Sequence, residues 1–297
     1  MWQKLSDEEL EKQYNCSNWS HRMSAKEVIE SHVNTLASGS LHALSTVSNE
    51  GEKAYGISEK EKLYIFGRDD LPPDAPVFVY IHGGYWQELD LESSFFMAPS
   101  FVDAGSIVVP IGYELAPKAS VDEIFEQSKR ALRYVTHFAR KRGSRGVYIS
   151  GHSAGGHLAA MLMTVDWNTE FMESSDIIKG FIPVSGIYDL RPLVRTTIND
   201  ALKMSEESAW NLSPMHLTEK AVRGCRNAKT LMVFAQHDPP EFHRQNNEFY
   251  QVLKQAGLDM RILKIDDTDH FNVIERLAEP DYVVTKEMLK LMGLPVS

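Results

Sequence analysis

Seven short apolar runs recur along this 297-residue chain, and several of them are apolar at every position rather than at alternate ones. Continuous apolar runs are typical of parallel strands that helices cover on both faces of a sheet. The runs span residues 62–66, 76–81, 106–111, 147–150, 181–184, 230–235 and 260–265. Segments with apolar residues at helical spacing separate them, notably 120–141, 243–256 and 281–292. The pattern predicts an α/β fold: a mostly parallel, twisted sheet with helices on both faces.

The N-terminal part of the chain precedes the first apolar run and reads differently. Residues 6–14 and 25–37 are predicted to be helices, the second beginning at a Ser24 cap with Glu27 three positions later. We interpret residues 1–50 as an N-terminal helical flank that packs on the main domain.

No internal repeat, low-complexity tract or Pro/Gly-rich linker divides the sequence, so a single domain over residues 1–297 is expected. The least regular stretch, about residues 186–228, is polar and Arg-rich and lies between two predicted strands. We interpret it as a small lid or cap insertion.

Composition narrows the class of protein. A formal net charge of −10 disfavours binding to nucleic acid and to anionic membrane surfaces. No stretch reaches the roughly 18 apolar residues of a membrane span, and the first ten residues lack the apolar core of a signal peptide, so a cytoplasmic protein is expected.

Cys16 and Cys225 lie far apart and outside any C-x-x-C spacing, which argues against a disulfide framework, a zinc site or a redox pair. The basic run at 140–145 is expected to end a helix.

A G-x-S-x-G pentapeptide, Gly151 to Gly155, follows the apolar run at 147–150 and leads into an apolar helical segment. This context predicts a nucleophile elbow, a sharp strand-to-helix turn that holds the Ser153 hydroxyl out of the sheet. Glycines at 151 and 155 remove side chains that would clash in such a turn. We therefore expect Ser153 to be a catalytic nucleophile.

The general base is expected to follow the nucleophile in the chain, on a loop at the carboxyl edge of the sheet. Five of the eleven histidines follow Ser153, namely His157, His216, His237, His243 and His270. Only His270 combines a preceding strand with a following helix, so it is our predicted base. We interpret His157 as a packed or capping group and His243 as the opening of a helix, while His216 in the lid stays an alternative.

The orienting acid belongs on the loop after another strand, and Asp238 follows the run at 230–235 almost directly. Asp266, Asp267 and Asp269 also precede His270, but they share its loop, where a carboxylate is badly placed to accept a hydrogen bond from the imidazole Nδ1. We predict Asp238 as the acid and interpret the other three as a solvated acidic turn.

Backbone amides of the H-G-G-Y-W segment that begins at His82 are candidates for an oxyanion hole. Paired glycines let a backbone approach a substrate oxygen closely. The predicted donors are Gly83, Gly84 and Ala154, with Tyr85 a candidate further donor, and His82 is expected to bond the loop backbone. A Gly-Gly turn that only ends a strand is the local alternative. The elbow, the Asp238 loop, the His270 loop and the Gly-Gly loop each follow a different predicted strand, however, and this combination favours a serine hydrolase.

Three segments together resemble the hormone-sensitive-lipase branch of the α/β-hydrolases: H-G-G-Y-W at 82–86, Y-x-L-A-P at 113–117 and G-H-S-A-G-G-H at 151–157. Within that branch the chain resembles the kynurenine formamidase (arylformamidase) family, because Tyr85-Trp86 stands where lipase relatives carry a third glycine. Residues 14–19, Y-N-C-S-N-W, are also similar to the N-terminal segment of that family. The resemblance covers nearly the whole chain and is weakest in the lid.

The resemblance implies an α/β-hydrolase fold and hydrolysis of N-formyl-L-kynurenine to L-kynurenine and formate in tryptophan breakdown. Such a reaction proceeds through a formyl-serine and needs no metal or organic cofactor. Two alternatives stay open: a short-chain carboxylesterase with the same triad, and a non-catalytic α/β-hydrolase that serves as a binding module. The sequence does not define the oligomeric state.

Aromatic and polar residues outside the triad are candidates for a substrate pocket. Trp19, Tyr85 and Trp86 are candidates for lining an aryl pocket, with core packing as the alternative for each. Candidates for meeting an amino-acid carboxylate are Arg191, Arg195 and Asn199, with a solvated lid surface as the alternative.

Overall fold

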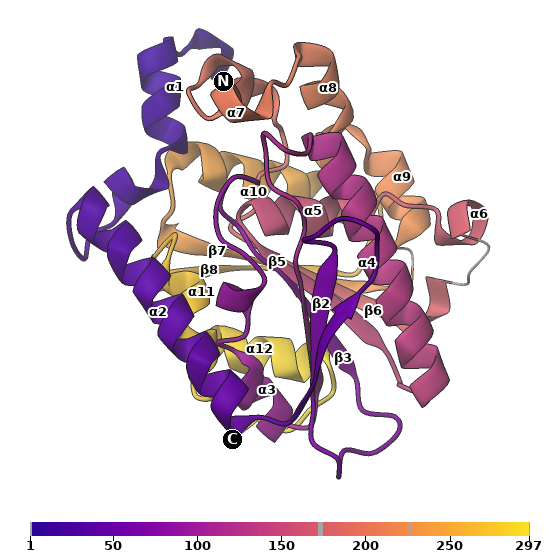
Figure 1. Ribbon diagram of the computed structural model, residues 1–297. Coiled ribbons are helices and arrows are strands. Elements are labelled where there is room, and N and C mark those ends of the chain that lie inside the picture. Colours follow the sequence, from indigo (N-terminus) through magenta and orange to yellow (C-terminus); the bar gives the residue numbers. More distant parts are fainter. Residues whose placement is uncertain (1, 172–174, 226, 297) are drawn as a thin grey trace.

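One eight-stranded sheet forms the centre of the computed structural model, which describes residues 2–171, 175–225 and 227–296 (Figure 1). The strands are β1 (Asn49–Ala54), β2 (Lys62–Phe66), β3 (Val77–Ile81), β4 (Ile107–Ile111), β5 (Val147–His152), β6 (Ile178–Val184), β7 (Lys229–His237) and β8 (Met260–Asp269). They lie in the order β1-β2-β4-β3-β5-β6-β7-β8.

The sheet is antiparallel at one edge and parallel elsewhere, because only β1–β2 and β2–β4 pair in opposite directions. The carboxyl ends of β3 to β8 therefore meet at one edge of the sheet. In register, Ile81 of β3 pairs with Gly151 of β5, which pairs in turn with Pro183 of β6. The loops that follow these three strands consequently begin side by side.

Helices cover both faces of the sheet (Figure 1). The α-helices are α1 (Asp7–Tyr14), α2 (Ala25–Thr46), α3 (Ala98–Asp103), α4 (Val121–Arg142), α5 (Ala154–Leu162), α6 (Trp167–Phe171), α7 (Asn199–Leu202), α8 (Glu206–Asn211), α9 (Thr218–Gly224), α10 (Pro240–Gln255), α11 (Asn272–Glu275) and α12 (Val283–Leu291). Short 3-10 helices lie at Trp2–Lys4, Cys16–Trp19, Glu92–Ser94, Ser175–Ile177, Arg191–Arg195, Pro214–His216 and Arg276–Ala278. Both α1 and α2 begin with a Ser–Glu capping box, at Ser6 and Ser24.

The core has two layers, one on each side of the sheet. Val77, Val79 and Ile81 of β3 pack in one layer with residues of α4, α5 and α10, while Phe78 and Tyr80 pack in the other with residues of α2, α3, α11 and α12. All five β3 side chains are buried. This two-sided burial is the physical reason for the continuously apolar runs in the sequence.

The α/β prediction is confirmed, and the differences lie where the sequence carries little apolar signal. β1 (N-E-G-E-K-A) is a polar edge strand with mostly exposed residues, so its sequence contains no apolar run from which a strand could be predicted. α2 extends to Thr46, past the predicted end at residue 37, and through Gly39, where a Cβ would lie 2.8 Å from the Cβ of Phe96. The lack of a side chain at Gly39 lets α2 pack closely against Phe96.

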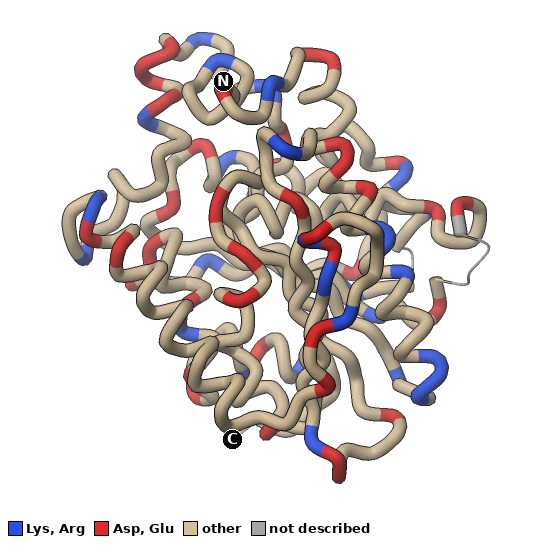
Figure 2. The backbone as a smooth tube through the Cα atoms, in the orientation of Figure 1, with Lys and Arg blue, Asp and Glu red and all other residues tan. Residues whose placement is uncertain are grey.

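The segment expected to be an irregular lid, 186–228, folds between β6 and β7 into short helices that include α7, α8 and α9; residue 226 lies outside the described residues. Figure 1 shows α1, α7 and α8 together at the top of the molecule, above α10. Figure 2 shows the basic run at the C-terminal end of α4, which ends at Arg142 as expected. Among the described helices, none has the length and apolar character needed to cross a membrane.

Candidate active site

Three polar side chains lie at the carboxyl edge of the sheet, each directly after a strand. Ser153 follows β5, Asp238 follows β7 and His270 follows β8. Their exposed fractions are 3%, 3% and 4%. Because β6 and β7 separate β8 from β5, His270 must reach back across two strands. The contact of its ring with His152, 4.7 Å between centroids, shows that it does.

The carboxylate of Asp238 is fully engaged and holds the imidazole. The Nδ1 and Oδ1 atoms of His270 and Asp238 are 2.6 Å apart. The other carboxylate oxygen accepts hydrogen bonds from the Ser185 hydroxyl, at 2.6 Å, and from the Ala235 amide, at 2.8 Å. These contacts fix the carboxylate, which in turn fixes the tautomer and orientation of the ring.

Electrostatics at His270 involve the N-terminal segment as well as Asp238. Burial works to lower the pKa of His270, but the neighbouring Cys16 thiol and the Asp238 carboxylate outweigh it and raise that pKa above the ordinary imidazole value. Cys16 is buried, and its sulfur lies 3.9 Å from the Tyr85 hydroxyl oxygen. Through its influence on the pKa of His270, this thiol of the N-terminal segment is part of the electrostatic environment of the candidate general base.

The turn at Ser153 has the strained backbone of a nucleophile elbow. Ser153 adopts φ 55° and ψ −115°, and its amide donates to the Val184 carbonyl at 2.9 Å. A Cβ at Gly151 would lie 2.2 Å from the Gly155 carbonyl oxygen, and one at Gly155 would lie 2.0 Å from that of Ile81. Side chains at either glycine are therefore incompatible with this packing.

The loop after β3 lies against the elbow. A Cβ at Gly83 would be 2.8 Å from the His152 carbonyl oxygen and 3.1 Å from the Cβ of Ser153. In the described part of the chain, the amides of Gly83, Gly84 and Ala154 donate to no protein acceptor. Unpaired N–H groups beside a buried serine are what binding of an anionic oxygen requires.

His82 supports this loop from within. Its Nδ1 lies 2.9 Å from the Gly83 carbonyl oxygen, and its ring stacks on Tyr113 at 4.1 Å between centroids. The Tyr113 hydroxyl donates to the His82 carbonyl at 2.9 Å. Burial lowers the pKa of His82 to about 4, so this histidine stays neutral near pH 7.

The aromatic candidates lie in different environments. Tyr85 is half-buried and donates its hydroxyl to the Tyr14 carbonyl at 2.6 Å. Trp86 is fully buried and meets His157 edge to face, at 5.0 Å between centroids. Trp19 is partly exposed and donates its indole N–H to the Lys12 carbonyl at 2.9 Å.

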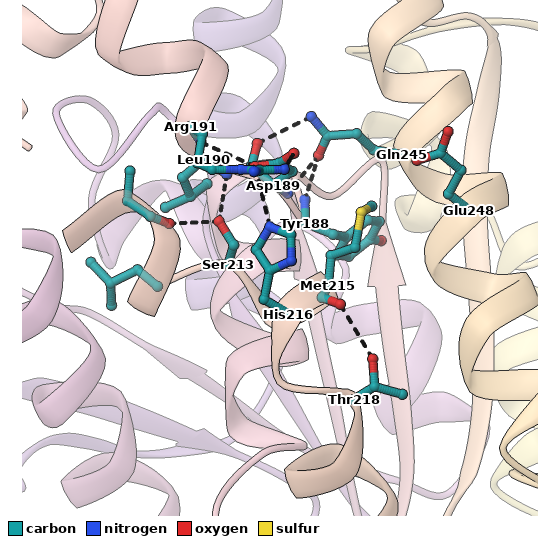
Figure 3. Close-up of polar contacts among 12 residues, drawn as sticks. Tyr188, Asp189, Leu190, Arg191, Ser213, Met215, His216, Thr218, Gln245 and Glu248 are labelled. Carbon is teal, nitrogen blue, oxygen red and sulfur yellow. Dashed lines mark hydrogen bonds and ion pairs between the residues drawn. The ribbon is translucent and has the colours of Figure 1, made fainter. Parts of the chain in front are cut away.

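Several polar side chains of the lid segment already have partners (Figure 3). Arg191 donates twice to the Asp189 carboxylate, both at 2.8 Å, and its guanidinium lies 4.8 Å from the Trp210 ring. Figure 3 shows contacts converging on Asp189 from Arg191, His216 and Gln245. His216 itself stacks on Trp210 at 3.8 Å.

The other lid candidates are paired as well. Arg195 donates to Asp7 at 2.8 Å and to the Leu5 carbonyl at 2.9 Å, whereas Asn199 exchanges hydrogen bonds with the backbone of Met204. The three candidates for meeting an amino-acid carboxylate thus bind other protein groups. Arg191 and Asn199 bind residues of the lid, and Arg195 binds the N-terminal segment.

Sequence reasoning missed the residues that support Asp238 and His270. Ser185 bonds Asp238, and His152 lies with its Nε2 2.8 Å from the His270 carbonyl oxygen. The interpretation of Asp266, Asp267 and Asp269 as a solvated acidic turn is wrong in two respects, because all three lie within β8 and one of them is buried. Asp266 and Asp267 have largely exposed side chains, but that of Asp269 is completely buried. Its partners, Ser20 and Arg22, come from the N-terminal segment, and no sequence spacing links them to Asp269.

Comparison with known proteins places the chain among hydrolases. The family model BD-FAE matches residues 63–247. A kynurenine formamidase from Danio rerio is 41% identical over 292 residues, covering 98% of each chain. A kynurenine formamidase from Salmo salar is 40% identical over 293 residues, again covering 98% of each.

A solved structure shares the overall fold. It is a Silicibacter sp. protein with the provisional name of a thioesterase, and it is 26% identical to this chain. The TM-score is 0.76, and the match covers 94% of this chain and 98% of the other.

Proposed function

Because the chain belongs to the BD-FAE family and to the kynurenine formamidase family, we propose that it hydrolyses the formamide of N-formyl-L-kynurenine to L-kynurenine and formate, in tryptophan breakdown. The observation that carries the proposal is the 41% identity to the Danio rerio kynurenine formamidase over 98% of both chains. The positions of Ser153, Asp238 and His270 after three strands at one edge of the sheet, together with the His270–Asp238 contact, supply a chemical route.

The first step makes an acyl-enzyme. The oxygen of Ser153 attacks the formyl carbon while its proton passes to Nε2 of His270. Asp238, 2.6 Å from Nδ1, holds the ring and stabilises the imidazolium that forms. His270 then gives this proton to the aryl nitrogen, the C–N bond breaks, and L-kynurenine leaves a formyl-serine behind.

The second step returns the enzyme to its starting state. Water attacks the formyl-serine as His270 takes one of its protons, and the Ser153 oxygen leaves with that proton from the imidazolium. Formate is released, so the reaction consumes one water and no other reactant. Neither a metal nor an organic cofactor takes part in this route.

The amides of Gly83, Gly84 and Ala154 serve as the oxyanion hole, with Tyr85 a candidate fourth donor. Support comes from the close approach of Gly83 to Ser153 and from the absence of protein acceptors for these three amides within the described residues. In comparable sites one lost donor costs about 2.7–4 kcal/mol of transition-state stabilisation.

The aryl ring of the substrate is assigned to a pocket that includes Trp19, Tyr85 and Trp86. The partly exposed rings of Trp19 and Tyr85 suit direct contact, whereas the ring of Trp86 is fully buried and packs on His157. The proposal also includes a single domain over 1–297 with 186–228 as its lid, and a cytosolic location.

A substrate comparison tests the function. Turnover of N-formyl-L-kynurenine, followed by the absorbance of the kynurenine product, is compared with hydrolysis of a short-chain p-nitrophenyl ester. The proposal predicts a higher kcat/KM for the formamide. A strong ester preference with negligible formamide hydrolysis would identify a short-chain carboxylesterase instead.

Labelling with a serine-reactive phosphonate addresses the remaining alternative. Wild-type protein should be labelled and Ser153→Ala should not. An unlabelled wild-type protein without hydrolase activity would identify a non-catalytic binding module.

A further inference from the structure

The loop that carries His270 is tied to a segment almost 250 residues earlier in the chain. The Ser20 hydroxyl donates to Oδ2 of Asp269 at 2.5 Å. Arg22 donates to the same oxygen through Nε at 2.8 Å and to Oδ1 through Nη2 at 3.2 Å. The Asp269 side chain has no exposed surface, and that of Arg22 is 23% exposed. A buried, bidentate ion pair of this kind is strongly directional.

The same carboxylate fixes the backbone on both sides of His270. Oδ1 of Asp269 accepts the amides of Phe271, at 3.0 Å, and Asn272, at 2.9 Å. In return, the Asn272 side chain accepts the Asp269 amide at 2.8 Å. His270 is the residue enclosed by this ring of hydrogen bonds, so movement of Asp269 moves the His270 backbone with it.

Further contacts complete the support of this loop. His152, directly before the nucleophile, approaches the His270 carbonyl oxygen to 2.8 Å through its Nε2. Burial lowers the pKa of His152 well below its ordinary value, so the ring is neutral. Arg22 also lies 3.5 Å from a carboxylate oxygen of Glu275, whose other oxygen is 2.7 Å from Nδ1 of His32 in α2.

The charge of Asp269 is stabilised by its partners. Burial raises its pKa, but hydrogen bonds from Arg22 and Ser20 lower it further than burial raises it. The five hydrogen bonds to this carboxylate come from Ser20, Arg22, Phe271 and Asn272, with Arg22 giving two. Loss of the Arg22 guanidinium would leave a buried carboxylate short of its compensating charge.

We propose that Asp269 and Arg22 are positioning residues for the reaction, which hold His270 through its backbone in the place where it takes the proton of Ser153. Neither residue is assigned a contact with substrate. The inference rests on the proposed function only through the roles of His270 and Ser153. With these roles, the N-terminal segment contributes to catalysis through His270 and does more than pack on the main domain.

The magnitude follows from the geometric demands of proton transfer. A displacement of about 1 Å at a catalytic group can cost about 10²-fold in rate. Arg22→Ala should therefore lower kcat for N-formyl-L-kynurenine about 10- to 100-fold and leave KM within about twofold, because substrate contacts are unchanged. Arg22→Lys, which keeps the charge but not the two-pronged geometry, should recover part of the loss.

The test uses the rate of phosphonate labelling at Ser153 beside steady-state kinetics. Arg22→Ala and Asp269→Asn should label more slowly by the same factor as their loss of kcat, yet reach the wild-type end point. A variant that only loses folded protein would show a lower end point at an unchanged rate. The matched control is Arg68→Ala, which removes an exposed bidentate pair with Asp70 and should change neither quantity.

Two results would overturn the inference: a wild-type labelling rate and kcat in folded Arg22→Ala, or a raised KM with unchanged kcat. If Arg22→Ala fails to fold, Arg22→Lys and Ser20→Ala give the same comparison with smaller changes. If the wild-type protein is labelled but does not hydrolyse N-formyl-L-kynurenine, the proposed substrate is wrong, and the labelling rates still decide the positioning role.

Discussion

Replacing Gly83 by alanine tests the oxyanion loop through sterics alone. The new Cβ would lie 2.8 Å from the His152 carbonyl oxygen, 3.1 Å from the Cβ of Ser153 and 3.3 Å from Nδ1 of His152. The nearest of these atoms belongs to the backbone of the elbow, so no side-chain rotation relieves the contact. The loop must withdraw by roughly half an ångström to restore ordinary packing distances.

Such a withdrawal moves the Gly83 and Gly84 amides out of the range of about 2.7–3.1 Å that an oxyanion requires. Loss of one donor costs about 2.7–4 kcal/mol, so kcat of Gly83→Ala should fall about 10²- to 10³-fold. Overpacking should also lower the free energy of unfolding by about 1–3 kcal/mol.

The assay is steady-state hydrolysis of N-formyl-L-kynurenine, with thermal unfolding to confirm that the variant is folded. Gly67→Ala is the matched control, because its Cβ would meet only the side chains of Ile107 and Leu71, both at 3.5 Å. Wild-type kcat in a folded Gly83→Ala protein would refute the assignment of this loop to the oxyanion hole.

Three further predictions concern the charged groups of the site. Asp238→Asn should lower kcat about 10⁴-fold while His270 stays in place, because the amide favours the wrong imidazole tautomer; an unchanged kcat would assign the acid elsewhere. Since His270 acts as a base and its pKa is raised, kcat/KM should rise with pH through an apparent pKa above about 6.5, and Cys16→Ala should move that value downward in a pH–rate profile. The lowered pKa of Asp269 means that its pairing with Arg22 stabilises the fold above the ordinary carboxyl pKa, and that this contribution is lost as the pH falls from about 5 toward the lowered value. As the pH falls over that range, the free energy of unfolding, measured by circular dichroism, should decrease less in Arg22→Ala than in the wild type. An equal decrease in both proteins would contradict the pairing.

The sequence predicts an element correctly where the local environment of that element requires one class of residue. Parallel strands buried on both faces carry mostly apolar residues, so β3 and the first half of β5 could be recognised from their continuous apolar runs. The order of elbow, acid and histidine then restricted Ser153, Asp238 and His270 to loops at one edge of the sheet.

Other features depend on contacts between distant segments, which local patterns do not report. β1 is polar because its residues lie at an exposed edge, so it reads like a loop. Asp269 reads like a solvated turn residue, because the arginine that pairs with it lies 247 positions earlier. Short lid helices such as α7, with four residues, carry too few turns for helical spacing to be visible.

Formate release by the Ser153→Ala protein tests whether this serine attacks the formamide of N-formyl-L-kynurenine. The variant removes only a hydroxyl, and circular dichroism establishes that it is folded. We expect kcat to fall about 10⁶-fold, as it does when the nucleophile of such a triad is removed. Formate release at the wild-type rate from a folded, unlabelled Ser153→Ala protein would contradict this role of Ser153.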